Sequence, residues 1–260
     1  MTALLRTEGV SKAFGGVQAL SDCTIEVEEG SITGLIGPNG SGKTTLFNVI
    51  TGYERVDSGE VYLGARRITN APPDKVFTAG IGRTFQLTRV FARLTVMENM
   101  IVAAHHGERS RAGRSWNPLA RAGGPATRRR AMELLEFTGI ANHAGARAET
   151  LSYGQRKLLE LSYVLIADPE IVLLDEPAGG INPTLISLLA DRIRELNAQG
   201  TTFLIVEHNM DFVMGLCQRV TVLDYGTAVV TGPPEVIRSD HRVLDAYLGT
   251  AEEDDDIPAA

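Results

Sequence analysis

Apolar and polar positions in the first third of the chain predict strands and helix in succession. Residues 22–28 (DCTIEVE) alternate polar and apolar side chains, which is the pattern of a strand buried on one face. Residues 31–37 (SITGLIG) form a short apolar run that ends in glycine, as in a buried strand entering a tight turn. A helix is predicted over 43–51, and another short strand over 60–63.

The middle of the chain has a helical pattern. Residues 95–139 predict mainly helix, and residues 131–137 (AMELLEF) have the apolar spacing of an amphipathic helix. We therefore expect a helical subdomain over approximately 88–165, inserted in an α/β core. Glycines and prolines interrupt the pattern at Gly113, Pro118, Gly123, Gly124 and Pro125.

The last third returns to alternating strands and helices. Strand, helix and strand in this order favour a largely parallel sheet covered by helices. The predicted strands are 171–174, 202–206 and 220–223, and the predicted longer helices are 153–167 and 183–199. The second of these helices has a proline in its first turn, a position that tolerates the missing amide hydrogen.

Composition and charge narrow the class of protein. The 260 residues fit one large α/β domain, or a main domain carrying a smaller one, and 43% hydrophobic with 22% charged residues is typical of a globular chain. Five charges of the net −7 lie in the acidic run 252–256, so we expect residues 250–260 to be a disordered tail. The remainder is close to neutral, which gives no electrostatic reason to expect a nucleic acid partner.

The cysteine content and the lack of long apolar runs indicate the redox compartment of the chain and its relation to the membrane. Cys23 and Cys217 lie far apart, so a zinc site or disulfide framework is not expected and a reducing compartment fits. No signal peptide is predicted at the N-terminus, and no window approaches the roughly 20 apolar residues that span a bilayer. A membrane connection is therefore expected to go through a partner.

A basic stretch lies within the helical middle section. Seven arginines and no acidic residue lie between Arg109 and Arg130. Two interpretations stay open: a solvated basic face, or a surface that approaches anionic lipid headgroups or an acidic partner loop.

Residues 37–44 (GPNGSGKT) match the phosphate-loop pattern G-x-x-x-x-G-K-[ST]. The match follows a predicted strand and precedes a predicted helix, which is the context that the chemistry requires. Backbone amides of such a loop surround phosphates, Lys43 contacts the β and γ phosphates, and the Thr44 hydroxyl binds Mg²⁺. The nucleotide contacts predicted here are Gly37, Asn39, Gly40, Ser41, Gly42, Lys43, Thr44 and Thr45.

Two carboxylates follow the buried strand of the last third, in the sequence IVLLDE at 171–176. In parallel α/β sheets, ligands lie at this end of the strands. We expect Asp175 to hold Mg²⁺ through water and Glu176 to polarise the attacking water. The alternative is a strand that merely ends at a charged turn.

Residues 151–155 (LSYGQ) resemble the signature motif of ABC ATPases, which is usually LSGGQ. Ser152 is placed as a helix N-cap and Gly154 permits close backbone approach, so this helix start can bind a γ-phosphate. In that family the phosphate belongs to the opposite subunit, and the resemblance implies nucleotide contacts at Ser152, Gly154 and Gln155. Tyr153 departs from the usual glycine, as it does in some branches of the family.

The same resemblance assigns further residues. Gln86, in RTFQ, is similar to the glutamine that touches Mg²⁺ and links the site to the membrane partner. His208 is similar to the switch histidine at the γ-phosphate, and Phe14 occupies the place of the aromatic that stacks on adenine. Asn182 replaces the usual aspartate of the dimer-contact loop.

The resemblance covers about residues 4–249 and is nearest to the larger ATPase of branched-chain amino acid importers. It rests on KAFGGVQAL at 12–20, GRTFQLTRVFARLTVMENM at 82–100, LSYGQRK at 151–157 and AYLG at 246–249. It implies a P-loop NTPase fold with a mainly parallel core sheet, an antiparallel β subdomain and an inserted helical subdomain, in a single domain over 1–249.

The activity implied is ATP hydrolysis with Mg²⁺, driving import of a small polar solute such as a branched-chain amino acid. The implied partners are two transmembrane permease subunits, a second ABC ATPase, identical or paralogous, in a head-to-tail dimer, and indirectly a solute-binding protein, at the cytoplasmic face of the membrane. Importers of urea or short amides share the pattern, and a soluble ABC ATPase outside transport is a further alternative. A small-molecule P-loop kinase would have no use for LSYGQ.

Overall fold

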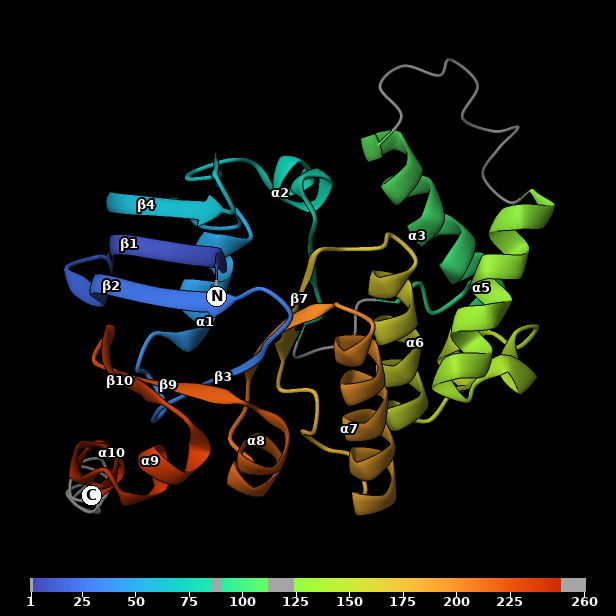
Figure 1. Ribbon diagram of the computed structural model, residues 1–260. Helices are drawn as coiled ribbons and strands as arrows, with labels where there is room; N and C mark the ends of the chain where they lie inside the picture. The colour runs from blue at the N-terminus through green and yellow to red at the C-terminus, as the bar shows by residue number, and fades with distance from the viewer. Residues whose placement is uncertain (1, 86–89, 112–123, 249–260) are drawn as a thin grey trace, which may run out of the picture. The chain divides into compact units, whose positions relative to one another are not determined.

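The structure, a computed structural model, describes residues 2–85, 90–111 and 124–248 (Figure 1). Its contacts divide the chain into two compact units. Unit 1 comprises Met1–Pro73 and Thr202–Ala260, and unit 2 comprises Asp74–Thr201. Each unit is described by itself.

Unit 1 contains an antiparallel sheet in the order β2-β1-β4-β5. Apolar residues that alternate along these strands, such as Leu5, Val10, Val27 and Val61, are almost fully buried on one face. The paired register joins Leu5 to Val27 on one side and to Leu63 on the other. The strands are β1 (Ala3–Phe14), β2 (Val17–Glu28), β4 (Ser58–Leu63) and β5 (Arg66–Arg67).

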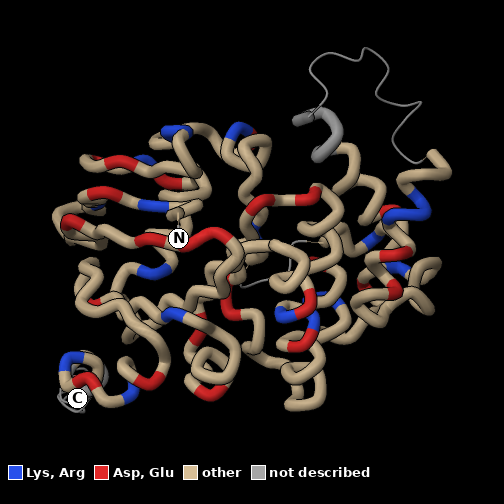
Figure 2. The backbone as a smooth tube through the Cα atoms, viewed as in Figure 1, with Lys and Arg blue, Asp and Glu red and all other residues tan. Residues whose placement is uncertain are grey.

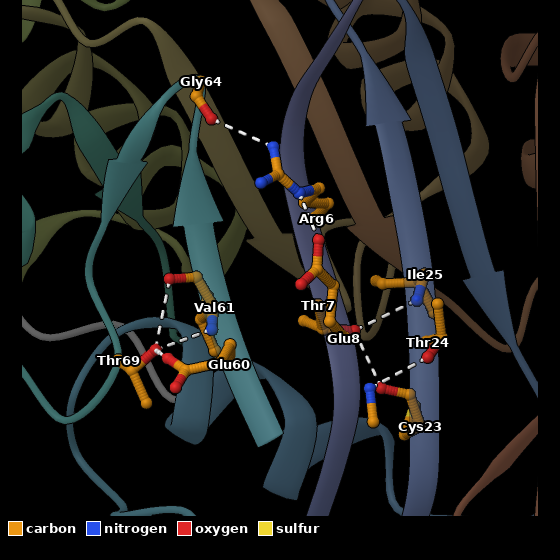
Figure 3. A network of polar contacts seen from close by, with 11 residues as sticks. Arg6, Thr7, Glu8, Cys23, Thr24, Ile25, Glu60, Val61, Gly64 and Thr69 are labelled. Atoms are coloured by element: carbon orange, nitrogen blue, oxygen red, sulfur yellow. Dashed lines mark hydrogen bonds and ion pairs between the residues drawn. The ribbon is translucent and has the colours of Figure 1, made fainter.

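Polar contacts stabilise this sheet where its register changes (Figure 3). The pairing of β1 with β2 shifts between Thr7 and Val10. The buried Thr7 hydroxyl donates to the Cys23 carbonyl and accepts from the Ile25 amide, each at 3.0 Å. A side chain thus takes part in the hydrogen bonding of β2, because an irregular ladder cannot pair every backbone group.

Unit 1 also contains four strands of a second sheet, in the order β10-β9-β3-β8. β3 (Ile32–Ile36) lies parallel to both β8 (Thr202–Val206) and β9 (Arg219–Asp224), and β10 (Thr227–Gly232) is antiparallel to β9. Every residue of β3 and β8 is buried, as expected of parallel strands with both faces covered. The helices of this unit are α1 (Lys43–Ile50), α8 (Met210–Leu216), α9 (Pro234–Ser239) and α10 (His241–Leu248).

Unit 2 contains two parallel strands and a group of packed helices. β6 (Ile81–Arg83) runs parallel to β7 (Ile171–Asp175), so both strands end at the same edge. α3, α5 and α6 pack on one another, and the buried hydroxyls of Thr138 and Ser162 join α5 to α6 at 2.8 Å. The helices are α3 (Val96–Arg111), α5 (Pro125–Thr138), α6 (Tyr153–Leu165), α7 (Pro183–Ala198) and α2 (Pro73–Ala79), which starts at the unit boundary.

The expected fold class is confirmed: parallel strands, an antiparallel sheet and a packed group of helices are all present. The domain boundaries remain predictions, and the tail 250–260 lies outside the described residues. Within the described ranges, no helix has both the length and the apolar character to cross a bilayer.

The basic stretch can be followed only in part. Basic residues mark the start of α5 in Figure 2, where Arg128, Arg129 and Arg130 are exposed. Arg130 lies 3.6 Å from Glu133 in an exposed ion pair. The side chains of the other four arginines lie outside the described residues, so both interpretations of this stretch stay open.

Candidate nucleotide site

The phosphate loop connects β3 to α1 in unit 1. Gly42 stands at the N-cap of α1 with φ 101°, and Gly37 has φ 153°. A Cβ on Gly37 would lie 2.1 Å from the Leu223 carbonyl oxygen, and one on Gly42 would lie 2.5 Å from that of Ala19. Only glycine fits at these two positions, because backbone oxygens cannot move aside as a flexible side chain can.

Lys43 is folded against this loop. Its Nζ donates to the carbonyl oxygens of Gly37 at 2.8 Å and Pro38 at 2.7 Å, and to the Ser41 Oγ at 3.3 Å. Lys43 is only 6% exposed, so a positive charge is fixed inside the loop at the start of a helix. A helix N-terminus with a cation beside it favours an anion.

The remaining loop residues present an open side. Asn39, Gly40 and Thr44 are exposed, and Thr45 is half-buried. A Cβ on Gly40, which has φ 79°, would meet no atom within 4 Å. The loop is therefore open to solvent on this side, so a phosphate can reach its backbone amides.

Phe14 and His208 are also in unit 1. Phe14 ends β1 with 44% of its surface exposed, and the Lys12 Nζ lies 5.1 Å from its ring centroid. His208 is exposed in the turn after β8, where its amide donates to the Glu207 Oε2 at 3.0 Å. Glu207 also accepts from the Asn209 amide at 3.1 Å, so this buried carboxylate shapes the turn that carries His208. Sequence reasoning missed Glu207.

Asp175 ends β7 in unit 2 and forms a buried ion pair. The Arg83 Nη2, from the end of β6, lies 3.0 Å from the Asp175 Oδ2, and each side chain is 6% exposed. The Asp175 amide donates to the Thr84 Oγ1 at 3.2 Å. Because β6 and β7 are parallel, their ends bring these residues together. Sequence reasoning missed Arg83, whereas Gln86, three residues further, lies outside the described residues.

Glu176 follows directly in a left-handed backbone conformation, with φ 48°. For a residue other than glycine this conformation costs about 1–2 kcal/mol. Its carbonyl accepts from the Gly179 amide at 3.2 Å and from the Lys157 Nζ. The half-buried Glu176 thus begins a turn immediately after the strand that ends in Asp175.

The LSYGQ segment forms the N-terminus of α6, as predicted. The Gln155 amide donates to the Ser152 Oγ at 3.2 Å, and the Ser152 amide donates to the Gln155 Oε1 at 2.9 Å. This reciprocal pair is a capping box. The Gln155 Nε2 lies 3.0 Å from the His143 Nε2, so the Gln155 side chain is engaged within its own chain.

Gly154 has a packing role that the sequence did not reveal. A Cβ on Gly154 would lie 2.1 Å from the Leu185 Cδ2 on α7. The glycine therefore permits α7 to approach the start of α6. The Leu185 side chain thus packs against the backbone of Gly154 within one chain, and this packing is separate from any contact that Gly154 makes with a ligand.

The predicted site residues therefore form two described sets. Unit 1 holds the phosphate loop from Gly37 to Thr45, with Phe14 and His208 elsewhere in the same unit. Unit 2 holds Asp175 beside Glu176, and the capped helix start from Ser152 to Gln155.

Comparison with known proteins identifies the family. The family described as "ABC transporter" matches residues 20–179, and "Branched-chain amino acid ATP-binding cassette transporter" matches residues 229–253. The high-affinity branched-chain amino acid transport ATP-binding protein LivG of Salmonella typhimurium is 39% identical over 251 residues, covering 95% of this chain and 98% of LivG. A probable LivG of Archaeoglobus fulgidus is 38% identical, covering 96% of each chain.

Solved structures of ABC transporter cassettes are similar to this chain in fold. A nucleotide-free ATP-binding cassette from an ABC transporter has a TM-score of 0.83 at 35% identity, covering 95% of this chain and 99% of its own. An ABC transporter cassette in its ADP conformation has the same TM-score and identity, covering 96% of this chain and 100% of its own. The chain therefore belongs to the ABC transporter family of ATP-binding cassette proteins, as its motifs indicated.

Proposed function

We propose that this chain is the ATP-hydrolysing subunit of an importer for branched-chain amino acids. The observation that carries the proposal is 39% identity across 95% of the chain to a protein named for that transport. The match of residues 229–253 to a family of the same transport class supports it independently of the ATPase motifs.

The residues of unit 1 fit a nucleoside triphosphate. The amides of the phosphate loop bind the phosphates, and Lys43 contacts the β and γ phosphates from its place inside the loop. The exposed ring of Phe14 stacks on adenine, and His208 contacts the γ-phosphate. Support comes from the open side of the loop at Gly40 and the buried ammonium of Lys43.

The residues of unit 2 fit the hydrolytic part of the reaction. By the resemblance to ABC ATPases, Asp175 holds Mg²⁺ through water, and Gln86 and Thr44 carry side-chain oxygens of the kind that Mg²⁺ prefers. When bound, Mg²⁺ neutralises charge on the phosphates. Glu176 orients and polarises the attacking water, since its carboxylate can accept a proton. Ser152, Gly154 and Gln155 bind the γ-phosphate held by a second cassette.

We further propose the partners that this arrangement requires. A second cassette, identical or paralogous, completes a head-to-tail dimer around the nucleotides. Two transmembrane permease subunits receive the motion at the cytoplasmic face of the membrane, and a solute-binding protein delivers the amino acid to them. Closure and reopening of the dimer then shift the permease between two states through differential binding.

Two measurements test this proposal. First, the Glu176→Gln variant should lose ATP hydrolysis while still binding ATP, and hydrolysis at the normal rate would refute the assignment of Glu176. Second, the tagged chain is purified from native membranes, and its ATPase rate is measured in vesicles with binding proteins loaded with leucine or with urea.

The second measurement separates the alternatives. Co-purification of permease subunits and stimulation by the leucine-loaded protein is the expected result. Stimulation only by the urea-loaded protein would show that the importer carries urea and not a branched-chain amino acid. If the chain co-purifies with no permease and no membrane protein changes its ATPase rate, the result would favour an ABC ATPase that acts outside transport.

A further inference from the structure

A buried lysine connects the α6 helix to the backbone of Glu176. Lys157 lies five residues after the N-cap Ser152 and is 8% exposed. Its Nζ donates to the carbonyl oxygen of Glu176. Lys157 also lines a cavity of about 20 Å³ together with Asp175 and Glu160. Burying an ammonium group costs free energy unless the group is hydrogen-bonded or paired with an opposite charge. The hydrogen bond to Glu176 is therefore a candidate for a functional contact.

Tyr153 supports the lysine from the same helix face. Residues four apart on a helix are neighbours, and the Lys157 Nζ lies 5.4 Å from the Tyr153 ring centroid. The same ring packs on Gly180, where an added Cβ would lie 3.0 Å from the Tyr153 Cε1. Tyr153 and Lys157 thus contact both ends of the turn 176–180. Tyr153 is also the residue that departs from the usual signature sequence.

The contact falls at a point of the backbone that needs support. Glu176 has the left-handed conformation, which persists in a residue other than glycine only where its surroundings hold it. Its carbonyl has two donors, the Gly179 amide within the turn and the Lys157 ammonium from α6. Bonds from a charged donor are about twice as strong as neutral ones. The backbone of Glu176 sets the direction in which its carboxylate points.

We infer that Lys157, with Tyr153 packed beside it, is a positioning residue that holds the backbone of Glu176 in the geometry needed for hydrolysis. The inference rests on the proposed catalytic role of Glu176. Lys157 touches no reacting atom in this scheme. It acts through the Glu176 carbonyl, and it explains why a tyrosine suits the third position of the LSYGQ segment.

The test compares Lys157→Met, which keeps the unbranched side chain up to Cε but loses the terminal donor, with Lys157→Arg, which keeps the charge. Lys157→Met should lower kcat by about tenfold or more, because misplacing a catalytic group by ~1 Å can cost ~10²-fold. The KM for ATP should stay within about twofold, since the phosphate loop is unchanged. Lys157→Arg should recover most of the rate. Arg156→Met, which also replaces a cationic side chain by methionine one residue away, is the matched control and should match wild type.

Two further readouts separate positioning from general stability. In the nucleotide-free protein, hydrogen exchange at the Gly179 amide should accelerate in Lys157→Met, because that amide shares the Glu176 carbonyl. In a Glu176→Gln background, Lys157→Met should have little further effect on the residual single-turnover rate, since both changes act on one group. If Lys157→Met fails to fold, Lys157→Gln is measured in its place with the same expected results, because Gln is polar but ends one atom short of the Lys157 Nζ.

The outcomes distinguish this inference from the proposed function. If Glu176→Gln abolishes hydrolysis while Lys157→Met keeps the wild-type kcat, the inference is wrong and the proposed function stands. Fully additive losses in the double variant, or unchanged exchange at Gly179, would also overturn it. If Glu176→Gln itself hydrolyses ATP normally, the catalytic assignment fails before Lys157 is considered.

Discussion

Removal of the Arg83 guanidinium should destabilise unit 2 by several kcal/mol. Arg83 and Asp175 form an ion pair at 3.0 Å in which each side chain is only 6% exposed. Taking away one partner leaves the other charge buried without its counter-ion, and such changes cost about 3–5 kcal/mol. That is a large part of the roughly 5–15 kcal/mol that typically separates folded from unfolded states.

The Arg83→Met variant keeps much of the side-chain volume, so the loss should reflect charge more than packing. For a chain of this size, about 1 kcal/mol shifts the unfolding midpoint by roughly 2–4 °C. The midpoint should therefore fall by about 6–20 °C, measured by calorimetry in the absence of nucleotide. Asp175→Asn alone should also destabilise, and the double variant should be less destabilised than the sum of the two.

Arg67→Met provides the matched control. Arg67 pairs with Glu60, but its side chain is 59% exposed, so solvent screens the pair and the midpoint should move much less. A midpoint in Arg83→Met that falls no further than in this control, or strict additivity with Asp175→Asn, would refute the argument that the buried pair stabilises the ends of β6 and β7.

Two further predictions concern pH and thiol chemistry. The hydrogen bond from Arg242 lowers the pKa of Asp240 to about 2, from an ordinary value of 3.8. Its stabilising effect should be complete above about pH 4 and decline as the pH falls through 2, so the midpoint difference between wild type and Asp240→Asn should shrink over that range; a difference that stays constant from pH 4 down to pH 2 would contradict this. Burial raises the pKa of Cys23 and of Cys217 to about 12, so neither thiol should react with iodoacetamide at pH 8 until the protein is unfolded. Rapid labelling of the native protein, followed by mass spectrometry, would refute this.

Local patterns predicted much of the fold. The strand predicted over 171–174 is β7 (Ile171–Asp175), and the helix predicted over 183–199 is α7 (Pro183–Ala198). Both are set by neighbours in the chain: a continuous apolar run in one case, and Asn182, which caps a helix with proline in its first turn, in the other. By contrast, β6 has three residues, too few to show a period, and is stabilised by pairing with β7.

The candidate site also contains residues that the sequence predicts and residues that only the tertiary structure reveals. The chemical identity of the loop around Lys43 is readable from sequence, because each glycine and the lysine have roles defined by spacing along the chain. Arg83 and Lys157 carry no such local signal. Their roles arise because parallel strands end together and because α6 packs on the turn after β7, contacts between residues 92 and 19 positions apart.

The sequence by itself determined the chemistry that this protein can perform: a phosphate loop, two carboxylates after a buried strand, and a helix start that resembles the ABC signature. Only the tertiary structure decided how those groups are supported. Charge on Asp175 is matched by Arg83, and the strained backbone of Glu176 is held by Lys157. The physical reason is that local patterns record propensity and spacing, whereas the partner of a buried charge is chosen by the packing of segments that are distant in the chain.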